Sequence, residues 1–327
     1  MQDEIIVVAG GGGFIGGHLV GDLLRKGHSV RAVDIKPLAD WWQVFPQADN
    51  VVADLRLKAG CEAACADAKT VYQLAADMGG MGFIEHNKAL CMLSVLINTH
   101  MLEASMGAGV TRFFYASSAC VYNADKQHDA QVIPLKEEDA YPAMPEDGYG
   151  WEKLFSERMC RHFREDFGLE TRVARLHNVY GPHGTWAGGR EKAPAAICRK
   201  VIDAKFRGTN AIEIWGDGHQ TRSFQFIDDC VYGAQAILAS DIIDPINLGS
   251  SELTTINGLV DIVEEIAGVT LTRTYNLSAP KGVNGRNSDN TRILNALGWE
   301  PTTRLRTGLE HTYRWIFDQY RGGNPLR

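Results

Sequence analysis

The chain of 327 residues is long enough for two domains, or for one large domain with an added lobe, and either can bury a full core without disulfides or metals. Hydrophobic residues make up 45% and charged residues 22%, which excludes a disordered chain, a collagen-like repeat and a bare coiled coil. The formal net charge is −7 and no run of five basic residues occurs, so nucleic acid and anionic membranes are not expected as partners.

The start of the chain and its cysteines predict a cytoplasmic location. A strand-like run at residues 5–9 leaves no room for the charged and apolar regions of a signal peptide. No continuous apolar stretch reaches the roughly 18 residues of a membrane span. The seven cysteines are scattered, with no C-x-x-C pair, which is typical of reduced thiols in a cytoplasm, and we expect no metal site.

The N-terminal region predicts a strand, a glycine turn, a helix and a second strand. The apolar run Ile5–Ala9 is followed by four glycines and by a helix-period pattern over Phe14–Lys26. A second apolar run, at residues 29–33, ends in Asp34. Strand-like runs return at 51–53, 71–75 and 113–116, with helical patterns between them. This alternation predicts the α/β class, with a doubly wound parallel sheet of the Rossmann type.

After about residue 175 the alternation loosens, and glycine and proline punctuation becomes frequent. Short strands are expected at 212–215, 246–248 and 271–275, with helices at 256–267 and 305–320. We therefore predict a smaller mixed α/β lobe in the C-terminal part of the chain.

The glycine turn has the spacing of a dinucleotide-binding site. Gly10 permits a tight turn after the strand, Gly13 lets backbone amides approach a pyrophosphate, and Gly16 lets the helix pack closely on the strand. Phe14 and Ile15 open the helix, where free amides and the helix dipole favour phosphate. These five residues are predicted to bind the cofactor.

Two aspartates follow neighbouring strands. Asp34, at the end of the second strand, can accept hydrogen bonds from both ribose hydroxyls of an adenosine and disfavours the 2′-phosphate of NADP, so the predicted cofactor is NAD. Asp54 follows the third strand and is assigned to the adenine amino group. An N-cap for a helix beginning near Leu55 explains Asp54 equally well on sequence alone.

A tyrosine and a lysine stand four residues apart at a predicted helix start. Tyr149 and Lys153 lie on the same helix face, and a nearby ammonium stabilises a phenolate. The pair can thus take a proton from a substrate hydroxyl while hydride leaves to NAD. Ser117 and Ser118 follow a strand, so we expect them at the carboxyl edge of the sheet, where ligands bind in this fold class.

Together with Asn178–Pro182, these features resemble the extended short-chain dehydrogenase/reductase family, the nucleotide-sugar epimerases and dehydratases, over about residues 5–320. Within it, the sequence is similar to the branch that inverts carbons 3 and 5 of GDP-mannose. The motifs that carry this similarity are residues 77–82, 117–122, 184–194, 215–224 and 285–290.

The resemblance implies an NAD-dependent conversion of GDP-D-mannose to GDP-L-galactose, with GDP-L-gulose as the product inverted at carbon 5 alone. It assigns Tyr149, Lys153 and Ser118 to oxidation and re-reduction at carbon 4. It assigns Cys120 as the base and Lys192 as the acid that invert the neighbouring carbons, whose hydrogens become acidic beside the ketone.

The substrate carries a diphosphate, so cations are expected near it. Arg286 and Lys200 are the first candidates, and the resemblance supports both, while Arg222 is the third. The other residues predicted to contact the GDP-sugar are Gly79, Ser118, Asn178, Glu191, Lys192 and Gln220.

The resemblance also suggests a domain division and an assembly. Residues 1–175 and 211–250 are assigned to the NAD-binding domain, and residues 176–210 and 251–327 to the substrate lobe. Such proteins commonly dimerise through the helix that bears the tyrosine and the helix before it, so we expect a homodimer. The apolar positions that would allow it are Leu93, Leu96, Leu154 and Met159.

The chain departs from the family pattern at residues 38–50, at 123–132 and after Tyr320, and none of these segments is expected to touch an assigned catalytic position. Two other functions stay open on the sequence: a 4-epimerase of another GDP-linked sugar that uses Tyr149 and Lys153 alone, and a non-catalytic NAD-binding sensor. The second acid/base pair argues against the sensor.

Overall fold

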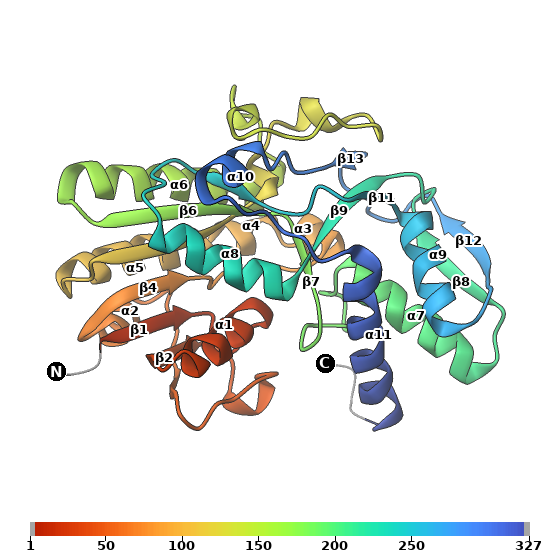
Figure 1. Ribbon diagram of the computed structural model, residues 1–327, viewed down its shortest axis with the longest axis horizontal. Helices are drawn as coiled ribbons and strands as arrows, with labels where there is room; N and C mark the ends of the chain where they lie inside the picture. Colours follow the sequence, from red (N-terminus) through yellow and green to blue (C-terminus); the bar gives the residue numbers. More distant parts are fainter. Residues whose placement is uncertain (1–3, 324–327) are drawn as a thin grey trace.

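The computed structural model describes residues 4–323 and is built on a seven-stranded, all-parallel sheet with the order β10-β6-β5-β4-β1-β2-β3 (Figure 1). The order reverses direction between β1 and β4, which is the feature of a doubly wound sheet. The predicted fold class is confirmed. The strands are β1 (Ile5–Ala9), β2 (Ser29–Asp34), β3 (Asp49–Val52), β4 (Ala68–Gln73), β5 (Arg112–Ser118), β6 (Glu170–Leu176) and β10 (Ile246–Leu248).

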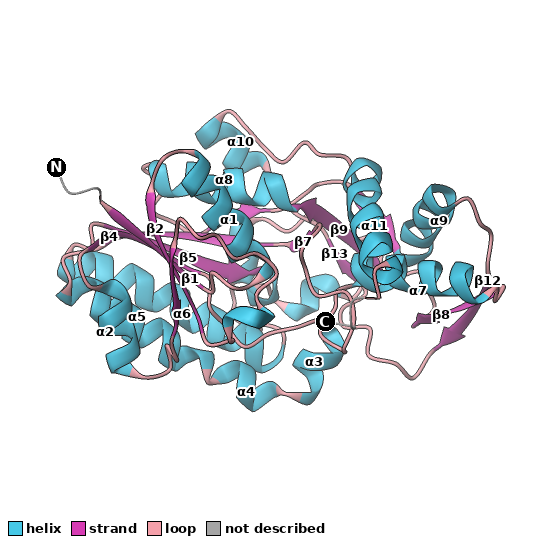
Figure 2. Cartoon of the chain, turned by 90° about the horizontal axis from the view of Figure 1, so that it is seen from below, coloured by secondary structure: helices cyan, strands magenta, loops and turns pink. Residues whose placement is uncertain are grey.

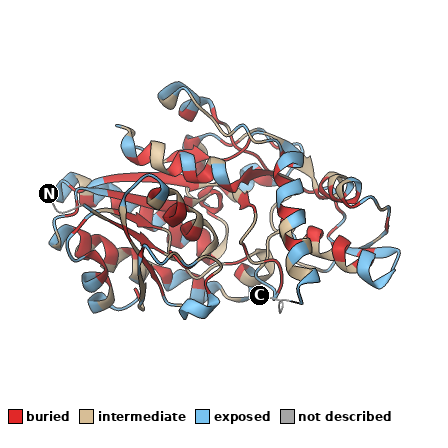
Figure 3. Cartoon of the chain, turned by 60° about the horizontal axis from the view of Figure 1, so that its bottom comes forward, coloured by how far each residue is buried: buried red, intermediate tan, exposed pale blue. Residues whose placement is uncertain are grey.

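Helices cover both faces of this sheet (Figure 2). On one face α1 (Phe14–Arg25) packs beside α8 (Ile227–Ala239), and on the other α2 (Lys58–Cys65), α5 (Ser94–Gly107) and α6 (Asp147–Phe167) lie side by side. Because both faces are covered, the central strands are buried along most of their length (Figure 3). This explains why the central strands read as continuous apolar runs instead of alternating patterns.

A smaller part of the chain lies beside the carboxyl end of the sheet and contains two small sheets (Figure 1). In one, β9 (Thr221–Phe226) pairs with β7 (Asn178–Tyr180), β11 (Leu253–Thr255) and β13 (Gly285–Arg286). In the other, β8 (Ala211–Trp215) pairs with β12 (Thr272–Asn276). The helices here are α7 (Ala193–Arg207), α9 (Ile256–Ala267) and α11 (Leu305–Arg321), whereas α10 (Thr291–Leu297) packs against β10 of the main sheet.

Short helical segments connect the large elements near the site. They are α3 (Met81–His86), α4 (Lys88–Met92) and the 3-10 turns η1 (Leu38–Asp40), η2 (Ala119–Val121), η3 (Ala124–Gln127) and η4 (Glu137–Ala140).

Most expected elements exist, and their ends differ by one to three residues. The first helix ends at Arg25 instead of Lys26, and the strand expected at 271–275 is Thr272–Asn276. Strand β4 begins three residues before the expected position, because its half-exposed start lacks the apolar run that marks its buried end.

The range 211–250, which the resemblance assigns to the NAD-binding domain, contributes to both parts of the structure: β10 lies in the main sheet, whereas β8 pairs with β12. The division into two domains stays a prediction, and its ends at 1–3 and 324–327 lie outside the described residues.

One finding differs from the expected absence of a membrane-length apolar segment. The stretch Lys88–Gly107, which comprises α4 and α5, is long and apolar enough to cross a bilayer by length and composition, with a mean hydropathy of 1.3. About two fifths of it, 39%, is buried inside the protein, and part of α5 packs against α2 and α6. All seven cysteines are free and buried.

Candidate active site

The glycine turn has the geometry of a phosphate cradle. Gly10 adopts a left-handed φ of +84°, and its amide and that of Gly11 donate to the carbonyl of Val33 at 2.7 and 3.0 Å. A Cβ on Gly16 would lie 2.0 Å from the Gly10 carbonyl oxygen, so only glycine lets helix α1 approach the turn. Gly13 caps α1 without a side-chain hydrogen bond, which leaves the first helix amides free for an anion.

The two aspartates have different surroundings. Asp34 is buried at the end of β2, and its carboxylate accepts a hydrogen bond of 3.1 Å from the Lys36 amide. Asp54 is held by Arg56 at 2.6 Å, and this hydrogen bond lowers the pKa of the Asp54 carboxyl. The helix-cap interpretation of Asp54 is wrong, since α2 begins at Lys58 with Leu57 as its N-cap. Contact of Asp54 with adenine stays a prediction.

Tyr149 and Lys153 lie on one buried face of α6, as their spacing predicts. The Lys153 ammonium donates to the carbonyl of Ala116 at 3.1 Å and lies 5.6 Å from the centre of the Tyr149 ring. Burial raises the pKa of Tyr149 well above its usual value, whereas a hydrogen bond with Ser118 lowers it. Burial lowers the pKa of Lys153. The lysine is thus the cation placed to favour a phenolate at Tyr149.

Cys120 lies in η2, directly after β5, in a small buried cluster with Tyr149. The Ser118 hydroxyl caps this turn and accepts a hydrogen bond of 3.2 Å from the Cys120 amide. The Cys120 sulfur lies 3.5 Å from Nη1 of Arg286, which belongs to β13 of the small sheet. Burial raises the pKa of the Cys120 thiol, and the charge of Arg286 acts in the opposite direction. The guanidinium of Arg286 therefore favours the thiolate form of this buried thiol.

Lys192 precedes α7 as its N-cap residue and is half-buried. Burial lowers the pKa of Lys192, and the nearby Cys120 raises it, so the two side chains are close enough to interact electrostatically. The loop at Gly79 and Gly80 lies against the same segment, because the Gly80 amide donates to the Arg190 carbonyl at 3.0 Å. The structure therefore brings Cys120, Tyr149 and Lys192 together from three separate parts of the chain.

Three other predicted substrate residues lie on or next to α7 and β7 and bond to groups of the protein. Lys200 donates to the Glu213 carbonyl at 2.6 Å and its ammonium lies 5.8 Å from the Trp215 ring. Glu191 pairs with Arg199 at 3.2 Å. Asn178 donates to the Ser223 carbonyl at 3.3 Å.

Gln220 and Arg222 lie on or next to β9. The amide nitrogen of Gln220 donates to the Trp215 carbonyl at 2.9 Å, while its buried Oε1 has no hydrogen-bond partner among the described residues. Arg222 donates to three backbone carbonyls, and burial lowers its pKa to about 10. An orphaned buried acceptor beside a backbone-bound guanidinium suits a polar ligand.

Comparisons with known proteins agree with this geometry. Residues 6–249 match the NAD dependent epimerase/dehydratase family. The chain belongs to this family. It is 47% identical to GDP-mannose 3,5-epimerase 1 of Oryza sativa subsp. indica and 45% identical to GDP-mannose 3,5-epimerase of Arabidopsis thaliana, in each case over 96% of this chain and 82% of the relative.

A solved member of the fold is also similar. The structure of UDP-glucose 4-epimerase with UDP-glucose from Thermotoga maritima superposes with a TM-score of 0.86 and 25% identity, covering 97% of this chain and 99% of that one. The family is NAD-dependent. The turn at Gly10–Gly16 and the buried Asp34 fit NAD, because they offer free amides to a pyrophosphate and a carboxylate to a ribose.

Sequence reasoning missed two residues of this epimerase/dehydratase site, Gln127 and Glu146. Both hold Arg286, by Oε1 of Gln127 at 2.7 Å and Oε2 of Glu146 at 2.7 Å. The divergent segment 123–132 therefore does reach an assigned site residue, although not a catalytic one. The partners of Arg286 in the structure are groups of the protein, and its contact with a diphosphate stays a prediction. No motif marks Gln127, since its role depends on the distant β13.

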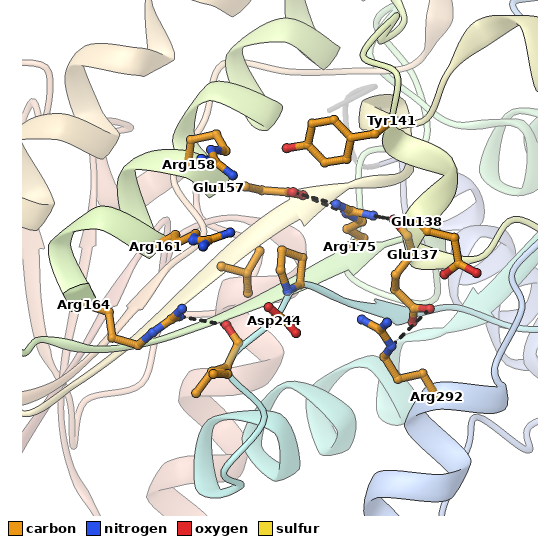
Figure 4. A pocket seen from close by; sticks show the side chains of 13 residues that line it. Glu137, Glu138, Tyr141, Glu157, Arg158, Arg161, Arg164, Arg175, Asp244 and Arg292 are labelled. Carbon is orange, nitrogen blue, oxygen red and sulfur yellow. Dashed lines mark hydrogen bonds and ion pairs between the residues drawn. The ribbon is translucent and has the colours of Figure 1, made fainter.

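A cavity of about 210 Å³ lies outside the site of this family member, between α6, η4 and α10 (Figure 4). None of the predicted site residues lines it. Its charged side chains largely neutralise one another: Arg175 is bidentate on Glu157 at 2.9 and 2.8 Å, and Arg292 lies 3.7 Å from Glu137. The cavity thus offers little net charge to a ligand.

Proposed function

We propose that the chain converts GDP-D-mannose to GDP-L-galactose by NAD-dependent epimerisation, with GDP-L-gulose as the product inverted at carbon 5 alone. The observation that carries the proposal is the juxtaposition of a second acid/base pair, Cys120 and Lys192, with Tyr149 and Lys153. A simple 4-epimerase needs only the tyrosine and the lysine. The similarity to two plant GDP-mannose 3,5-epimerases supports the choice of substrate.

The first pair acts at carbon 4. Bound NAD supplies the reversible two-electron oxidation of this carbon. Tyr149 takes the proton of the carbon 4 hydroxyl, and Lys153, 5.6 Å from the ring centre, favours the phenolate that accepts it. Ser118, at the end of β5, lowers the pKa of Tyr149 against the effect of burial. After the inversions, Tyr149 returns the proton to the carbon 4 oxygen.

The second pair acts at carbons 5 and 3. While carbon 4 is a ketone, the hydrogens of the neighbouring carbons are acidic. The Cys120 thiolate, with Arg286 at 3.5 Å, removes the carbon 5 proton, and the Lys192 ammonium delivers a proton to the opposite face. Cys120 then releases its proton to solvent and Lys192 takes one up, and repetition of the step at carbon 3 gives the doubly inverted sugar. Each inversion breaks one C–H bond and forms one, so no net oxidation results.

Substrate binding completes the proposal. Lys200, Arg222 and Arg286 lie in the part of the chain that adjoins the reacting residues and supply positive charge for the diphosphate. The unpartnered Oε1 of Gln220 offers an acceptor. Gly79 is assigned to the sugar as well, and Phe83 restricts it to a small residue, because a Cβ there would lie 2.8 Å from the Phe83 side chain.

Incubation with GDP-mannose in D₂O tests this function, with deuterium located in the sugar by NMR. Label at carbons 3 and 5 is the expected result, and label at carbon 5 alone restricts the product to GDP-L-gulose. Inversion at carbon 4 without label would replace the proposal by a 4-epimerase. An absence of turnover with a panel of GDP-sugars would leave the NAD-binding sensor. UDP-glucose serves as the matched control substrate.

We also infer a homodimer through α5 and α6. Large apolar side chains are exposed on this surface. They are Leu93, just before α5, Leu96 on α5, and Trp151 and Phe155 on α6. Met159 is half-buried, while Leu154, one of the expected contact positions, belongs to the core instead. A dimer would cover this patch, which also accounts for the apolar character of Lys88–Gly107 without a membrane.

Light scattering of the wild type and of a variant with Leu96→Glu and Phe155→Glu tests the dimer. A dimeric wild type and a monomeric, folded variant are expected. Sedimentation of the wild type with lipid vesicles instead would overturn the inference.

We also propose that the protein is cytoplasmic, because its seven cysteines are free and buried. Cell fractionation tests this location.

A further inference from the structure

A closed polar network lies beneath Lys153, on the side of α6 that faces α5 and the sheet. Gln73 of β4 donates to Oδ1 of Asn98 at 2.7 Å, which orients the Asn98 amide. The amide nitrogen of Asn98 then donates to Oε1 of Glu152. The Glu152 side chain is fully buried, with 0% exposure. A carboxyl group therefore stands in the core of the protein, immediately before the lysine that the proposed reaction needs.

The two oxygens of Glu152 have unlike surroundings. Besides Asn98, the hydroxyl of Ser156 donates to Oε1 at 2.9 Å and that of Tyr115 at 3.5 Å. Convergence of three donors on one oxygen is typical of a carboxylate, which only accepts hydrogen bonds. Oε2 has no hydrogen-bond partner among the described residues and lies 3.9 Å from Nζ of Lys153. The network thus holds one oxygen and leaves the other to face the ammonium.

Lys153 needs such a neighbour. Burial lowers its pKa, and the charge of Glu152 is the strongest influence in the opposite direction. Burial raises the pKa of the tyrosines and cysteines around Lys153, which favours their neutral forms, and Glu157 pairs with Arg175 at 2.8 Å. The titratable side chains that face Lys153 are Tyr149, Glu152, Glu157 and Cys160 of α6, Tyr115 of β5 and Cys120 of η2.

We propose that Glu152 is a positioning residue that acts through Lys153, its carboxylate being the counter-charge that keeps the lysine protonated beside Tyr149. Glu152 does not line the reacting groups, since its oxygens are turned toward Asn98 and Lys153. The proposal deepens the proposed function and rests on it, because the charged lysine matters only if Tyr149 exchanges a proton with the substrate.

The pH profile of kcat for E152Q tests the proposal. Activity needs the Tyr149 phenolate at the acid limb and the Lys153 ammonium at the alkaline limb. Loss of a negative charge lowers both pKa values, so both limbs should move to lower pH. The alkaline limb should move most, by about one to three pH units, the range for a charge within ~4–6 Å. KM for the GDP-sugar should change little.

E152D is the matched control, because it keeps the charge and alters only the packing. Its limbs should coincide with those of the wild type even if kcat falls. E138Q removes an exposed carboxylate from η4 and should leave the profile unchanged. If E152Q lowers kcat uniformly while both limbs stay in place, Glu152 is only structural and the proposal is overturned. Should E152Q fail to fold, E152S is the smaller neutral variant for the same profile.

A second measurement does not depend on turnover. The midpoint of urea unfolding should be lower for E152Q than for the wild type at about pH 7, where an ammonium without its counter-charge is buried. The difference should narrow toward about pH 10, as the lysine of the variant loses its proton first. A difference that is constant with pH contradicts the proposal. A wild type inactive on GDP-mannose would refute the proposed function, whereas an active wild type with unshifted variant limbs refutes only this inference.

Discussion

Arg286 lies 3.5 Å from the sulfur of Cys120, although the two residues are 166 positions apart in the chain. Arg286 is buried and is held in place by Gln127 and Glu146. Although burial opposes its charge, Glu146 and Cys120 raise the pKa of Arg286, so the guanidinium stays charged beside the thiol. This cation favours the thiolate that the proposed inversion requires.

Substitution R286Q should therefore weaken the base. Deuterium incorporation at carbon 5 should fall about 100-fold, the lower end of what a positioned general base contributes, and its onset should move to higher pH because the thiol loses its cation. NMR of the sugar in D₂O at several pH values measures both effects. R292Q, beside the cavity outside the site, is the control. An unchanged onset would mean that Arg286 serves only the diphosphate.

Cys120→Ala should abolish exchange at carbon 5 and leave NAD bound. The thiol is the proposed base, whereas the glycine turn that binds the cofactor is elsewhere. Cys91→Ala is a matched control, because Cys91 is a buried thiol of the same cluster and its pKa is raised to about 11 by burial. Release of NAD from the Cys120→Ala protein would show instead that the thiol is structural.

Tyr149→Phe should lower kcat by about 10²- to 10⁴-fold, because the variant lacks the group that takes the carbon 4 proton. Stopped-flow absorbance after mixing with GDP-mannose should show no reduction of bound NAD. Tyr141→Phe removes a hydroxyl from an exposed tyrosine and should behave as the wild type. Full activity of Tyr149→Phe would transfer the role to another residue.

Gly16→Ala should lose NAD and stability. The added methyl group would lie 2.0 Å from the Gly10 carbonyl oxygen, and overpacking of this kind costs about 1–3 kcal/mol. Gly107→Ala is the contrasting change at the end of α5, where nothing lies within 4 Å, and it should stabilise the fold by roughly 0.5 kcal/mol. Calorimetry and the NAD content of the purified proteins measure both. Equal NAD content would contradict the assigned packing.

Stability should fall on mild acidification because of His177. Burial lowers the pKa of this side chain to about 4 from 6.5, so the unfolded chain binds a proton that the folded protein refuses. The neutral His177 side chain contributes to the free energy of unfolding above about pH 6.5, and this contribution is lost as the pH falls toward about 4. About 2 kcal/mol of it is lost at about pH 5. Urea unfolding should show a smaller loss for H177Q than for the wild type. The control variant H128Q changes an exposed histidine, and its stability should fall on acidification as much as that of the wild type.

The fold and the cofactor turn could be predicted because their signals are local. The spacing of Gly10, Gly13 and Gly16 reflects contacts within one turn, and the apolar strands are continuous because the sheet is covered on both faces. The pair Tyr149 and Lys153 follows from helical spacing alone. Each of these predictions needs no knowledge of distant residues.

The long-range parts of the site could not be predicted in this way. Glu146 and Gln127 reach the site only through Arg286, and β13 lies more than a hundred residues further along the chain. Glu152 reads in the sequence as an ordinary helix carboxylate, and only packing against α5 buries it. Leu154 fits an apolar contact surface by spacing, but it faces the core.

The contact between β13 and η2 has a consequence for the evolution and engineering of the chain. In the proposed mechanism Cys120 acts as a base only when the strand that carries Arg286 is docked, so a chain without β13 would lack the cation beside the thiol. Chemistry at carbon 5 thereby reports on the completed assembly of the C-terminal part, while NAD binding does not. Segment 123–132 also contacts this part of the chain, since Gln127 accepts a hydrogen bond from Arg286 and the carbonyl of Ala130 accepts one from Thr221.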